Sequence, residues 1–371
     1  MTSTLDPLRF TSDPSTTECH QEIQEILQRR ISITELPEAH FYPAIGFDGK
    51  LHTDLYGQMP VGLYVLPNAA VIGAYRLVLT ESGAILREQN AGIYTDLELM
   101  RAYCSTPLGC TDGGEMEVME DIISLTSACC YCFYHWMMDS LPKVVLAEMT
   151  GYTGQYLVPP AVMTRWVEES MALLGIDPAR IVRSGKNIVR TERLYIPTYF
   201  SGFNNRSHRE IITEYRRRML ERIRPENHKR LFIPRKPSAA LRRITNHEEV
   251  SHFLGTHGFY ETYFEDHSLT EQIALAAGAE SLVAPHGSGM VHTLFMKPKS
   301  TVIELFPYSN VDSCGCYHST MELLGHRYYW PSSSQNCGSD IYVDTAQLQS
   351  ILEGEVEPYD FLCSPSTPPR L

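Results

Sequence analysis

Residues 281–305 read SLVAPHGSGMVHTLFMKPKSTVIEL, and this stretch decides the fold of the second half of the chain. It begins with a short apolar run, 282–284, which is too short for a helix and typical of a buried strand. A glycine turn follows at 287–289, and we expect an apolar helix over 290–296 and a second buried strand over 301–305. The order strand, glycine turn, helix, strand predicts a βαβ unit whose tight turn lies at the carboxyl end of a strand.

The turn formed by Gly287, Ser288 and Gly289 suits a phosphate ligand. A helix N-terminus carries N–H groups without helical acceptors and a partial positive charge, and glycines let the backbone approach the ligand closely. Glu304 stands in an otherwise apolar strand, where a carboxylate needs a partner, and the ribose hydroxyls of a nucleotide are one candidate. The alternative is an ordinary βαβ turn with Glu304 at the exposed end of its strand.

Length, charge and cysteine usage exclude several classes of protein. A chain of 371 residues is typical of two domains that each bury a core. The formal net charge of −13 argues against a nucleic-acid partner, which usually calls for a basic face. We find no signal peptide and no apolar run of the roughly 18 residues that span a bilayer, so we expect a cytoplasmic protein without a transmembrane segment. The ten cysteines contain one C-x-x-C spacing, Cys129 to Cys132, but no second one to pair with it, so reduced thiols are expected and a zinc site is not.

The N-terminal half begins with a segment, 1–18, whose composition is typical of disorder, and a short helix is expected over 19–31. Strands are expected over 61–66 and 70–79, with Pro67-Asn68 as the turn between them. This pattern predicts a small β-meander, and we see no catalytic signature in it.

A second informative segment lies at 134–141, which has a helical pattern ahead of Pro142. His135 and Asp139 are four residues apart, so they share one face of a helix. A histidine and an aspartate on one face of an apolar, aromatic segment form a candidate acid/base pair. The alternative is a core histidine, with Asp139 as its partner or as a cap near Pro142.

From residue 156 onward, strand and helix patterns alternate. Strands are expected at 156–158, 180–183, 194–196, 230–233, 259–263 and 327–330, and helices at 161–174, 210–224, 247–254, 269–277, 311–324 and 344–352. Asn246 is expected to cap one helix, and Ser268 with Glu271 has the capping-box spacing for another. The alternation predicts a parallel sheet with helices on both faces, and we place the domain boundary at 205/206, giving domains 1–205 and 206–371.

Ligands of such sheets bind outside the carboxyl ends of the strands. Arg235, one or other of Arg242 and Arg243, and His286 all follow expected strands at such ends. Arginine suits phosphate because its planar guanidinium donates two parallel hydrogen bonds. The alternative for each arginine is a solvated loop.

These motifs, taken in order, resemble the family 61 glycosyltransferases. The resemblance covers roughly residues 60 to 353, and its motifs are Tyr134-His135-Trp136-Met137-Met138-Asp139-Ser140-Leu141-Pro142, Pro234-Arg235-Lys236, Arg243-Ile244-Thr245-Asn246-His247-Glu248, Gly258-Phe259, Glu271-Gln272, His286-Gly287-Ser288-Gly289 and Val302-Ile303-Glu304. Three positions depart from the family pattern: Ser288 replaces a usual alanine, Lys143 replaces a frequent arginine, and the acidic residue after Asn246 is displaced by one to Glu248.

The resemblance implies an α/β fold of the GT-B type, in which two Rossmann-like domains face each other across a cleft. The sugar nucleotide would bind the C-terminal domain, and the acceptor mainly the N-terminal one. Members transfer xylose, N-acetylglucosamine or arabinose with inversion, so we expect a UDP-sugar donor and a glycan, protein or small-molecule acceptor. The sequence leaves a homodimer open.

The roles that the resemblance implies follow from what an inverting transfer needs, a base for the acceptor hydroxyl and stabilisation of the leaving diphosphate. Asp139 is the expected base, with His135 as the alternative or as the residue that orients Asp139. The expected sugar-nucleotide site comprises Arg235, Arg243, His286, Gly287, Ser288, Gly289 and Glu304, with Glu304 on the ribose and no metal required.

Three other functions are open to the sequence. A hydrolase with Ser288 as nucleophile lacks the G-x-S-x-G pattern, because the glycines lie directly beside the serine. A dinucleotide oxidoreductase lacks the third glycine, since His292 stands there. The third is a non-catalytic protein that keeps the fold and binds a sugar nucleotide or a glycan.

Overall fold

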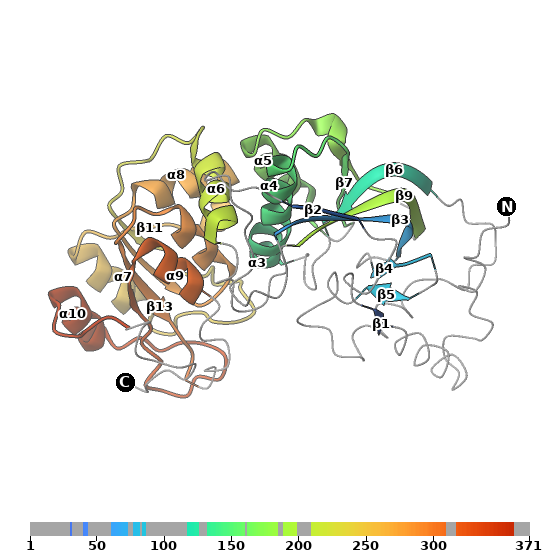
Figure 1. Cartoon of the computed structure of the whole chain (residues 1–371). Coiled ribbons are helices and arrows are strands. Elements are labelled where there is room, and N and C mark those ends of the chain that lie inside the picture. Colours follow the sequence, from blue (N-terminus) through green and yellow to red (C-terminus); the bar gives the residue numbers. More distant parts are fainter. Residues whose placement is uncertain are drawn as a thin grey trace, which may run out of the picture. The chain divides into compact units, whose positions relative to one another are not determined.

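The computed structural model describes residues 30–31, 40–43, 61–72, 77–81, 84–86, 117–125, 132–159, 162–184, 188–198, 209–308 and 317–359. The chain divides into two compact units, Met1–Tyr215 and Arg216–Leu371, and each contains its own β-sheet (Figure 1). None of the helices in these ranges is long and apolar enough to cross a membrane. The segments expected at 1–18 and at most of 19–31 lie outside the described residues.

The first unit contains a mixed sheet of strand order β1-β5-β4-β3-β9-β6-β7-β8, with β2 paired to β3. The strands are β1 (Arg30–Ile31), β2 (His40–Pro43), β3 (Gly62–Ile72), β4 (Leu77–Leu79), β5 (Ile85–Leu86), β6 (Glu117–Ser124), β7 (Gln155–Leu157), β8 (Ile181–Val182) and β9 (Ile188–Pro197). The strands from β2 to β5 and β9 pair with their neighbours mainly in antiparallel fashion, whereas β6 to β8 continue the sheet in parallel. The expected meander is therefore part of a larger sheet.

The expected turn at Pro67-Asn68 was wrong, because β3 runs straight through it. Pro67 pairs with Arg193 and Ala69 with Thr191, so the long partner strand β9 holds both sides of the interruption. Asn68 takes the left-handed conformation at φ +51°, which asparagine tolerates better than most residues. Strand β6, which sequence analysis did not recognise, pairs with the other edge of β9.

The helices assigned to the first unit are α3 (Phe133–His135), η4 (Trp136–Ser140), α4 (Leu141–Met149), α5 (Thr164–Leu173) and η5 (Pro178–Arg180), and α6 (Arg209–Leu220) spans the unit boundary. The helical pattern over 134–141 is confirmed, with one difference: η4 is a π-helical insertion between α3 and α4. Two side chains anchor the insertion. The Trp136 indole donates to Ser170 Oγ at 3.1 Å, and Ser140 Oγ donates to the Leu125 carbonyl at 3.0 Å.

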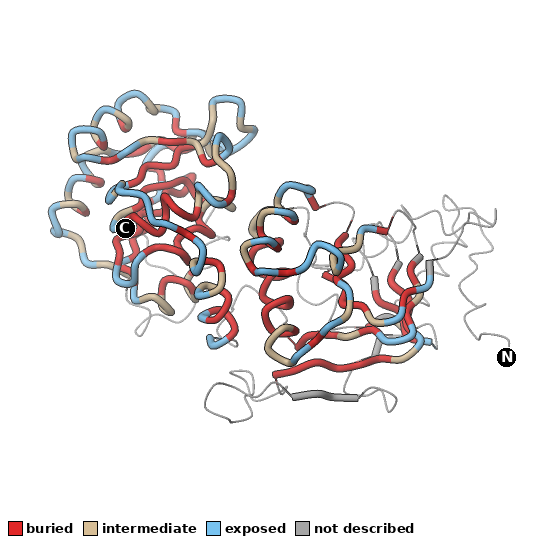
Figure 2. The backbone as a smooth tube through the Cα atoms, turned by 90° about the horizontal axis from the view of Figure 1, so that it is seen from above, coloured by how far each residue is buried: buried red, intermediate tan, exposed pale blue. Residues whose placement is uncertain are grey.

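The second unit contains a sheet in which all strand pairs are parallel, as expected from the alternating pattern. Its order is β11-β10-β12-β13-β14, formed by β10 (Arg230–Phe232), β11 (Tyr260–Glu261), β12 (Ser281–Pro285), β13 (Thr301–Leu305) and β14 (Arg327–Tyr329). The helices are α7 (His247–Thr256), η7 (Phe264–Asp266), α8 (Leu269–Gly278), η8 (Ser288–Phe295), α9 (His318–Leu324) and α10 (Thr345–Glu353). Figure 2 shows the strands buried at the centre and exposed backbone on the outer helices.

Helices lie on both faces of this parallel sheet. Val250 and Leu254 of α7 and Leu348 of α10 belong to one core with the alternate strand residues Phe232 and Ile303. Helices α8 and α9 contact η8 instead. Because strand side chains alternate between faces, Glu304 and Tyr328 point away from the face that Ile303 and Tyr329 share with α7 and α10.

Local signals in the second unit were confirmed in part. The capping box of α8 is present, since Ser268 and Glu271 exchange side-chain and backbone hydrogen bonds. Asn246 does not cap α7; its amide group instead bonds the backbone of Val343, because that segment lies alongside it. The segment after the glycine turn is a 3₁₀ helix, η8, rather than an α-helix. The expected helix over 311–324 begins at His318, and residues 309–316 lie outside the described part of the chain.

Candidate functional site

The turn after β12 lies at the carboxyl edge of the parallel sheet, and Gly287 is required there for two reasons. Its φ of +154° lies in a region that side-chain-bearing residues rarely adopt. A Cβ atom at this position would also lie 2.0 Å from Nη2 of Arg235. The guanidinium of Arg235 therefore lies directly against the backbone of the turn, where it donates to the His286 carbonyl at 3.4 Å.

Of the two neighbouring arginines that the sequence left open, Arg242 is the one that reaches the turn. Its Nη1 donates to the His286 carbonyl at 2.9 Å, and its backbone is in the left-handed region at φ +61°. Arg243 instead makes a two-pronged pair with Asp340, with Nη2 at 2.7 Å and Nε at 3.1 Å from the same oxygen. The Arg243 guanidinium lowers the pKa of the Asp340 carboxyl through this pair. Two guanidiniums, from Arg235 and Arg242, thus meet at one carbonyl of the turn.

His286 itself is held by a buried carboxylate. Its Nδ1 lies 2.5 Å from Oε1 of Glu304, and the hydroxyl of Tyr328 donates to Oε2 of the same carboxylate at 2.5 Å. The side chain of Glu304 is 1% exposed and that of His286 is 8% exposed. The expected partner of Glu304 is therefore found inside the protein, as His286 and Tyr328. Binding of ribose by Glu304 stays a prediction, since both carboxylate oxygens already accept hydrogen bonds.

Two aromatic residues complete the surroundings of the turn. The Phe306 ring stacks on the His286 imidazole at 4.8 Å between centroids, with the ring planes 23° apart. The Tyr317 hydroxyl donates to the carbonyl of Gly287 at 2.6 Å. The imidazole plane and the carbonyl of Gly287 are thus both fixed by direct contacts.

The first unit contains a similar histidine–carboxylate pair. Nδ1 of His135, the last residue of α3, lies 2.7 Å from Oδ2 of Asp139 in the π-helical insertion η4. The side chain of Asp139 is 5% exposed and that of His135 is 15% exposed. The carboxylate is therefore the inner member of the pair and the imidazole the outer one. Single-turn π-helical insertions of this kind are found frequently at functional sites.

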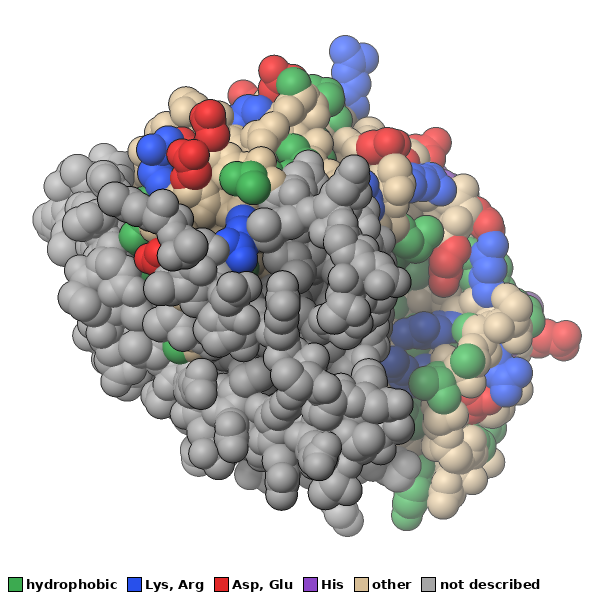
Figure 3. Space-filling view, turned by 90° about the vertical axis from the view of Figure 1, so that its right-hand side faces the viewer, with side chains coloured by type: hydrophobic (Ala, Val, Ile, Leu, Met, Phe, Trp, Pro, Cys, Tyr) green, Lys and Arg blue, Asp and Glu red, His purple; other side chains and the backbone are tan. Residues whose placement is uncertain are grey.

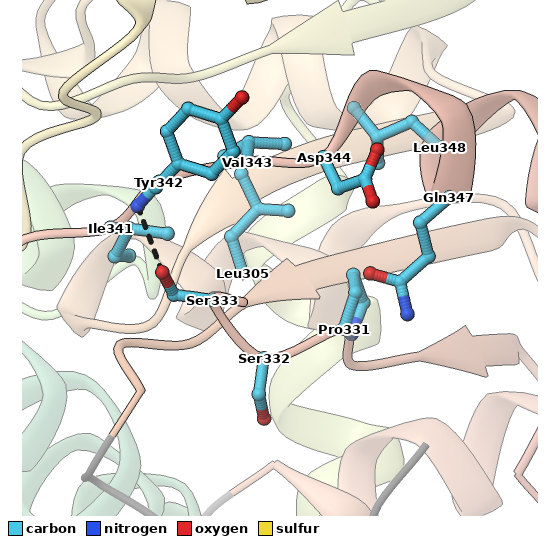
Figure 4. A pocket seen from close by; sticks show the side chains of 10 residues that line it. All are labelled: Leu305, Pro331, Ser332, Ser333, Ile341, Tyr342, Val343, Asp344, Gln347 and Leu348. Carbon is cyan, nitrogen blue, oxygen red and sulfur yellow. Dashed lines mark hydrogen bonds between the residues drawn. The ribbon is translucent and has the colours of Figure 1, made fainter. Parts of the chain in front are cut away.

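A small hollow that is partly open to solvent lies near the carboxyl end of β13 in the second unit (Figure 4). It lies between Leu305, the segment Pro331–Ser333, and the start of α10 at Asp344 and Gln347. The backbone N–H of Tyr342 donates to Ser333 Oγ across it at 3.1 Å. The enclosed space of the hollow is about 10 Å³, room for about one water molecule, so we assign it no ligand.

We also searched the described residues for metal ligands and for charged surfaces beside the clusters around His286 and His135. Among the described residues, no group of three or more His, Cys, Asp or Glu side chains converges as a metal site would require. On the described part of the face in Figure 3, acidic and basic side chains are interspersed. At the glycine turn, in contrast, the two guanidiniums of Arg235 and Arg242 lie together.

Two residues that surround the turn, Tyr328 and Tyr317, were not predicted from the sequence. Tyr328 pairs with Val302 across β13 and β14, which places it two positions from Glu304 on the same face of the sheet. The alternation of strand residues could have indicated this, once β14 was taken as the neighbour of β13. Tyr317 lies just ahead of α9, and the sequence carries no comparable signal for it.

Comparison with known families supports the resemblance stated above. Residues 133–303 match the model of the family Glycosyltransferase 61, which confirms it. The chain is also 29% identical over 114 residues to protein O-linked-mannose β-1,4-N-acetylglucosaminyltransferase 2 of Homo sapiens and of Pan troglodytes, and 28% identical to that of Mus musculus. These alignments cover 27% of this chain and 20% of the relatives, so the chain aligns with about a fifth of the length of the curated relatives it matches.

Proposed function

Because residues 133–303 match glycosyltransferase family 61, we propose that this chain is an inverting glycosyltransferase that moves a sugar from a UDP-sugar to an acceptor hydroxyl. The observation that carries the proposal is the presence, inside the matched range, of one cluster suited to a diphosphate and one suited to proton removal. The matched relatives are named as N-acetylglucosaminyltransferases, which favours N-acetylglucosamine as the transferred sugar. Xylose and arabinose, which the family resemblance also implies, are the other two candidates.

The second unit is the proposed donor site. Arg235 and Arg242 place two permanent positive charges at the turn around Gly287. The helix η8 begins directly after this turn, and its first N–H groups favour an anion. Guanidinium groups hold phosphate oxygens through charge-assisted hydrogen bonds. These charges offset the charge of the leaving diphosphate, so the proposed reaction does not depend on a metal ion.

In the first unit we assign the base role to His135 rather than to Asp139. Asp139 is the more buried of the two, and its carboxylate accepts a hydrogen bond from Nδ1–H of His135. This contact selects the tautomer of His135 that has its lone pair on Nε2. Within the described residues, Nε2 of His135 has no hydrogen-bond partner. An imidazole held in this way by a carboxylate is a general base of well-known geometry.

The proposed reaction is one displacement at the anomeric carbon of the donor. Nε2 of His135 takes the proton of the acceptor hydroxyl as its oxygen forms a bond to the anomeric carbon. The bond between that carbon and the β-phosphate oxygen breaks, and its electron pair leaves with UDP. Attack from the side opposite the leaving group inverts the configuration. The proposal requires the two units to act as the lobes of a GT-B enzyme around one donor and one acceptor.

Kinetics of the variant His135→Ala test this assignment. We expect kcat for sugar transfer to fall by about 10²- to 10⁴-fold, the usual contribution of a general base, while the affinity for UDP stays within twofold of wild type. Added imidazole should restore part of the rate, because it supplies the missing base. The variant Glu169→Gln, which weakens the helical ion pair with Arg165 away from His135 and Asp139, serves as control.

The same experiment separates the two candidate bases. If Asp139→Asn is rescued by formate while His135→Ala is not rescued by imidazole, then Asp139 is the base and our assignment is wrong. If the wild-type chain transfers no sugar from UDP-xylose, UDP-arabinose or UDP-N-acetylglucosamine and binds no UDP, the proposed function itself is wrong.

A further inference from the structure

We propose that Tyr328 and Glu304 are positioning residues that hold Nε2 of His286 as a hydrogen-bond donor to the diphosphate of the donor. This inference rests on the proposed function, because it requires a diphosphate at the glycine turn. It assigns Glu304 a partner role toward His286 in place of the ribose contact expected from the sequence.

The first step is the set of contacts that Glu304 makes. Its carboxylate accepts one hydrogen bond from the Tyr328 hydroxyl and one from Nδ1–H of His286, each at 2.5 Å. A carboxylate that is 1% exposed needs partners inside the protein, and the Tyr328 hydroxyl and the His286 imidazole are those partners.

The second step is the orientation of the imidazole. With Nδ1–H committed to Glu304, the remaining polar atom of the ring is Nε2, which has no hydrogen-bond partner within the described residues. Stacking on Phe306 fixes the ring plane. The ring is thus held in one orientation with Nε2–H available for a ligand.

The third step is the electrostatic environment of that ring. Arg235 and Arg242 donate to the backbone carbonyl of His286. Its ring contacts Glu304 and Tyr317, the Tyr328 hydroxyl donates to Glu304, and His318 packs against the ring of Tyr328. Two guanidiniums side by side at the turn favour an anionic ligand.

A diphosphate is the anion that this arrangement suits best. Two forked guanidiniums and one imidazole provide donors for several phosphate oxygens at once, whereas a carboxylate ligand would need only one fork. During transfer, negative charge grows on the β-phosphate oxygen that leaves the anomeric carbon. A hydrogen bond from Nε2–H to that oxygen stabilises the charge without a proton having to move.

Tyr328→Phe is the most informative variant, because it removes one hydroxyl and keeps the ring. We expect its affinity for UDP to fall by about 3- to 10-fold, the usual effect of losing one hydrogen bond, while the affinity for uridine is unchanged. Tyr329→Phe is the matched control: it removes a hydroxyl from the next position of the same strand, on the opposite face of the sheet. Calorimetric titration with UDP and with uridine measures both, and thermal melting shows that each variant is folded.

Glu304→Gln adds a readout that a merely structural role would not change. Glu304→Gln removes the carboxylate that accepts from Nδ1–H of His286, so the affinity for UDP should fall about 3- to 10-fold. The affinity for uridine should stay within twofold of wild type, because the variant acts only through the contact of His286 with the diphosphate. If Glu304→Gln does not fold, the comparison of Tyr328→Phe with Tyr329→Phe still decides.

The two proposals fail in different ways. If the wild type binds UDP and Tyr328→Phe binds it equally well, the positioning role is overturned while the proposed function stands. The same conclusion follows if uridine and UDP affinities fall together, since the effect would then be a general distortion of the site. If the wild type binds no UDP, both proposals are wrong.

Discussion

Two histidines in this chain share one arrangement, and it shows what a buried carboxylate does at the scale of single residues. In both His135–Asp139 and His286–Glu304, the carboxylate lies on Nδ1 and is the more buried partner. The carboxylate accepts from Nδ1–H and orients the ring, and the less buried imidazole presents Nε2. The same pair therefore serves either as a base or as a donor to an anion, depending on the charges around it.

Part of this could be predicted from the sequence. A glutamate within the apolar strand 301–305 needs a partner, and the spacing of His135 and Asp139 places both on one helical face. The identity of the partners of Glu304 could not be predicted, because Tyr328 reaches it only through the pairing of β13 with β14. The choice between Arg242 and Arg243 depends on Asp340, which is distant in the sequence.

Gly287→Ala tests the close contact between the turn and Arg235. A methyl group would lie 2.0 Å from the guanidinium nitrogen and would force a disfavoured backbone conformation, so Arg235 must move away. We expect UDP affinity to fall at least tenfold, which calorimetric titration measures. Gly255→Ala, where nothing lies within 4 Å of the added carbon, is the control. Equal UDP affinity in both variants would remove Arg235 from the phosphate site.

His292 is expected to make the stability of the chain depend on pH. Burial lowers the pKa of its imidazole to about 4, below its usual value of 6.5, while Nδ1 bonds the carbonyl of Gly289. Below pH 6.5 the unfolded chain takes up a proton that the folded chain refuses, so stability falls as the pH falls from 6.5 to about 4. The full effect is about 3 kcal/mol, from about 1.36 kcal/mol per pKa unit.

Urea unfolding at pH 7, 5.5 and 4.5 measures this dependence. His326, whose pKa burial also lowers, contributes in the same direction. The variant His292→Leu removes one of the two groups, so its free energy of unfolding should fall less steeply between pH 7 and 4.5. If the free energy of unfolding depends on pH equally in the wild type and in His292→Leu, His292 does not cause the dependence.

At the scale of elements, the predicted helix and strand boundaries were correct where the residues that determine them are close together in the sequence. Strand β13 was predicted residue for residue, and the capping box of α8 is present as expected. The prediction of local structure failed where the interacting residue is distant in the sequence. Asn68 does not turn the chain because β9 holds both sides of it, and the π-helical insertion η4 depends on the anchoring of Trp136 at Ser170.

Ser268→Ala tests the capping box of α8. The variant removes the side-chain acceptor for the Glu271 N–H, and we expect the free energy of unfolding to fall by about 1 kcal/mol. Thr270→Ala, one position into the first turn, keeps the capping pair and should change stability by less than about 0.5 kcal/mol. Chemical denaturation measures both. Equal losses would show that the box does not stabilise the helix.

At the scale of the whole molecule, the chain carries two units, each with a mixed or parallel sheet and its own core. The alternating pattern of the second unit predicted its parallel sheet, because consecutive strands there are joined by helical crossovers. The first unit was harder to predict, since its long antiparallel pair β3–β9 joins segments more than a hundred residues apart.

UDP is expected to stabilise the folded chain as a whole, because it binds only the native state. At a concentration of 100 times Kd the gain is about 2.7 kcal/mol, which is seen as a rise in Tm. Arg242→Ala should reduce the rise, since it removes one guanidinium from the turn. Arg230→Ala, at the opposite end of the strand β10, should leave it unchanged. A rise that both variants keep in full would exclude Arg242 from the donor site.

The most direct test of the account is UDP release from UDP-N-acetylglucosamine, UDP-xylose and UDP-arabinose, measured with and without hydroxyl-bearing acceptors such as mannosides and peptides. We expect the wild-type chain to release UDP from at least one donor, faster with an acceptor present, and His135→Ala to bind UDP yet release almost none. Equal release by His135→Ala and the wild type, or no release and no UDP binding by the wild type, would contradict the account.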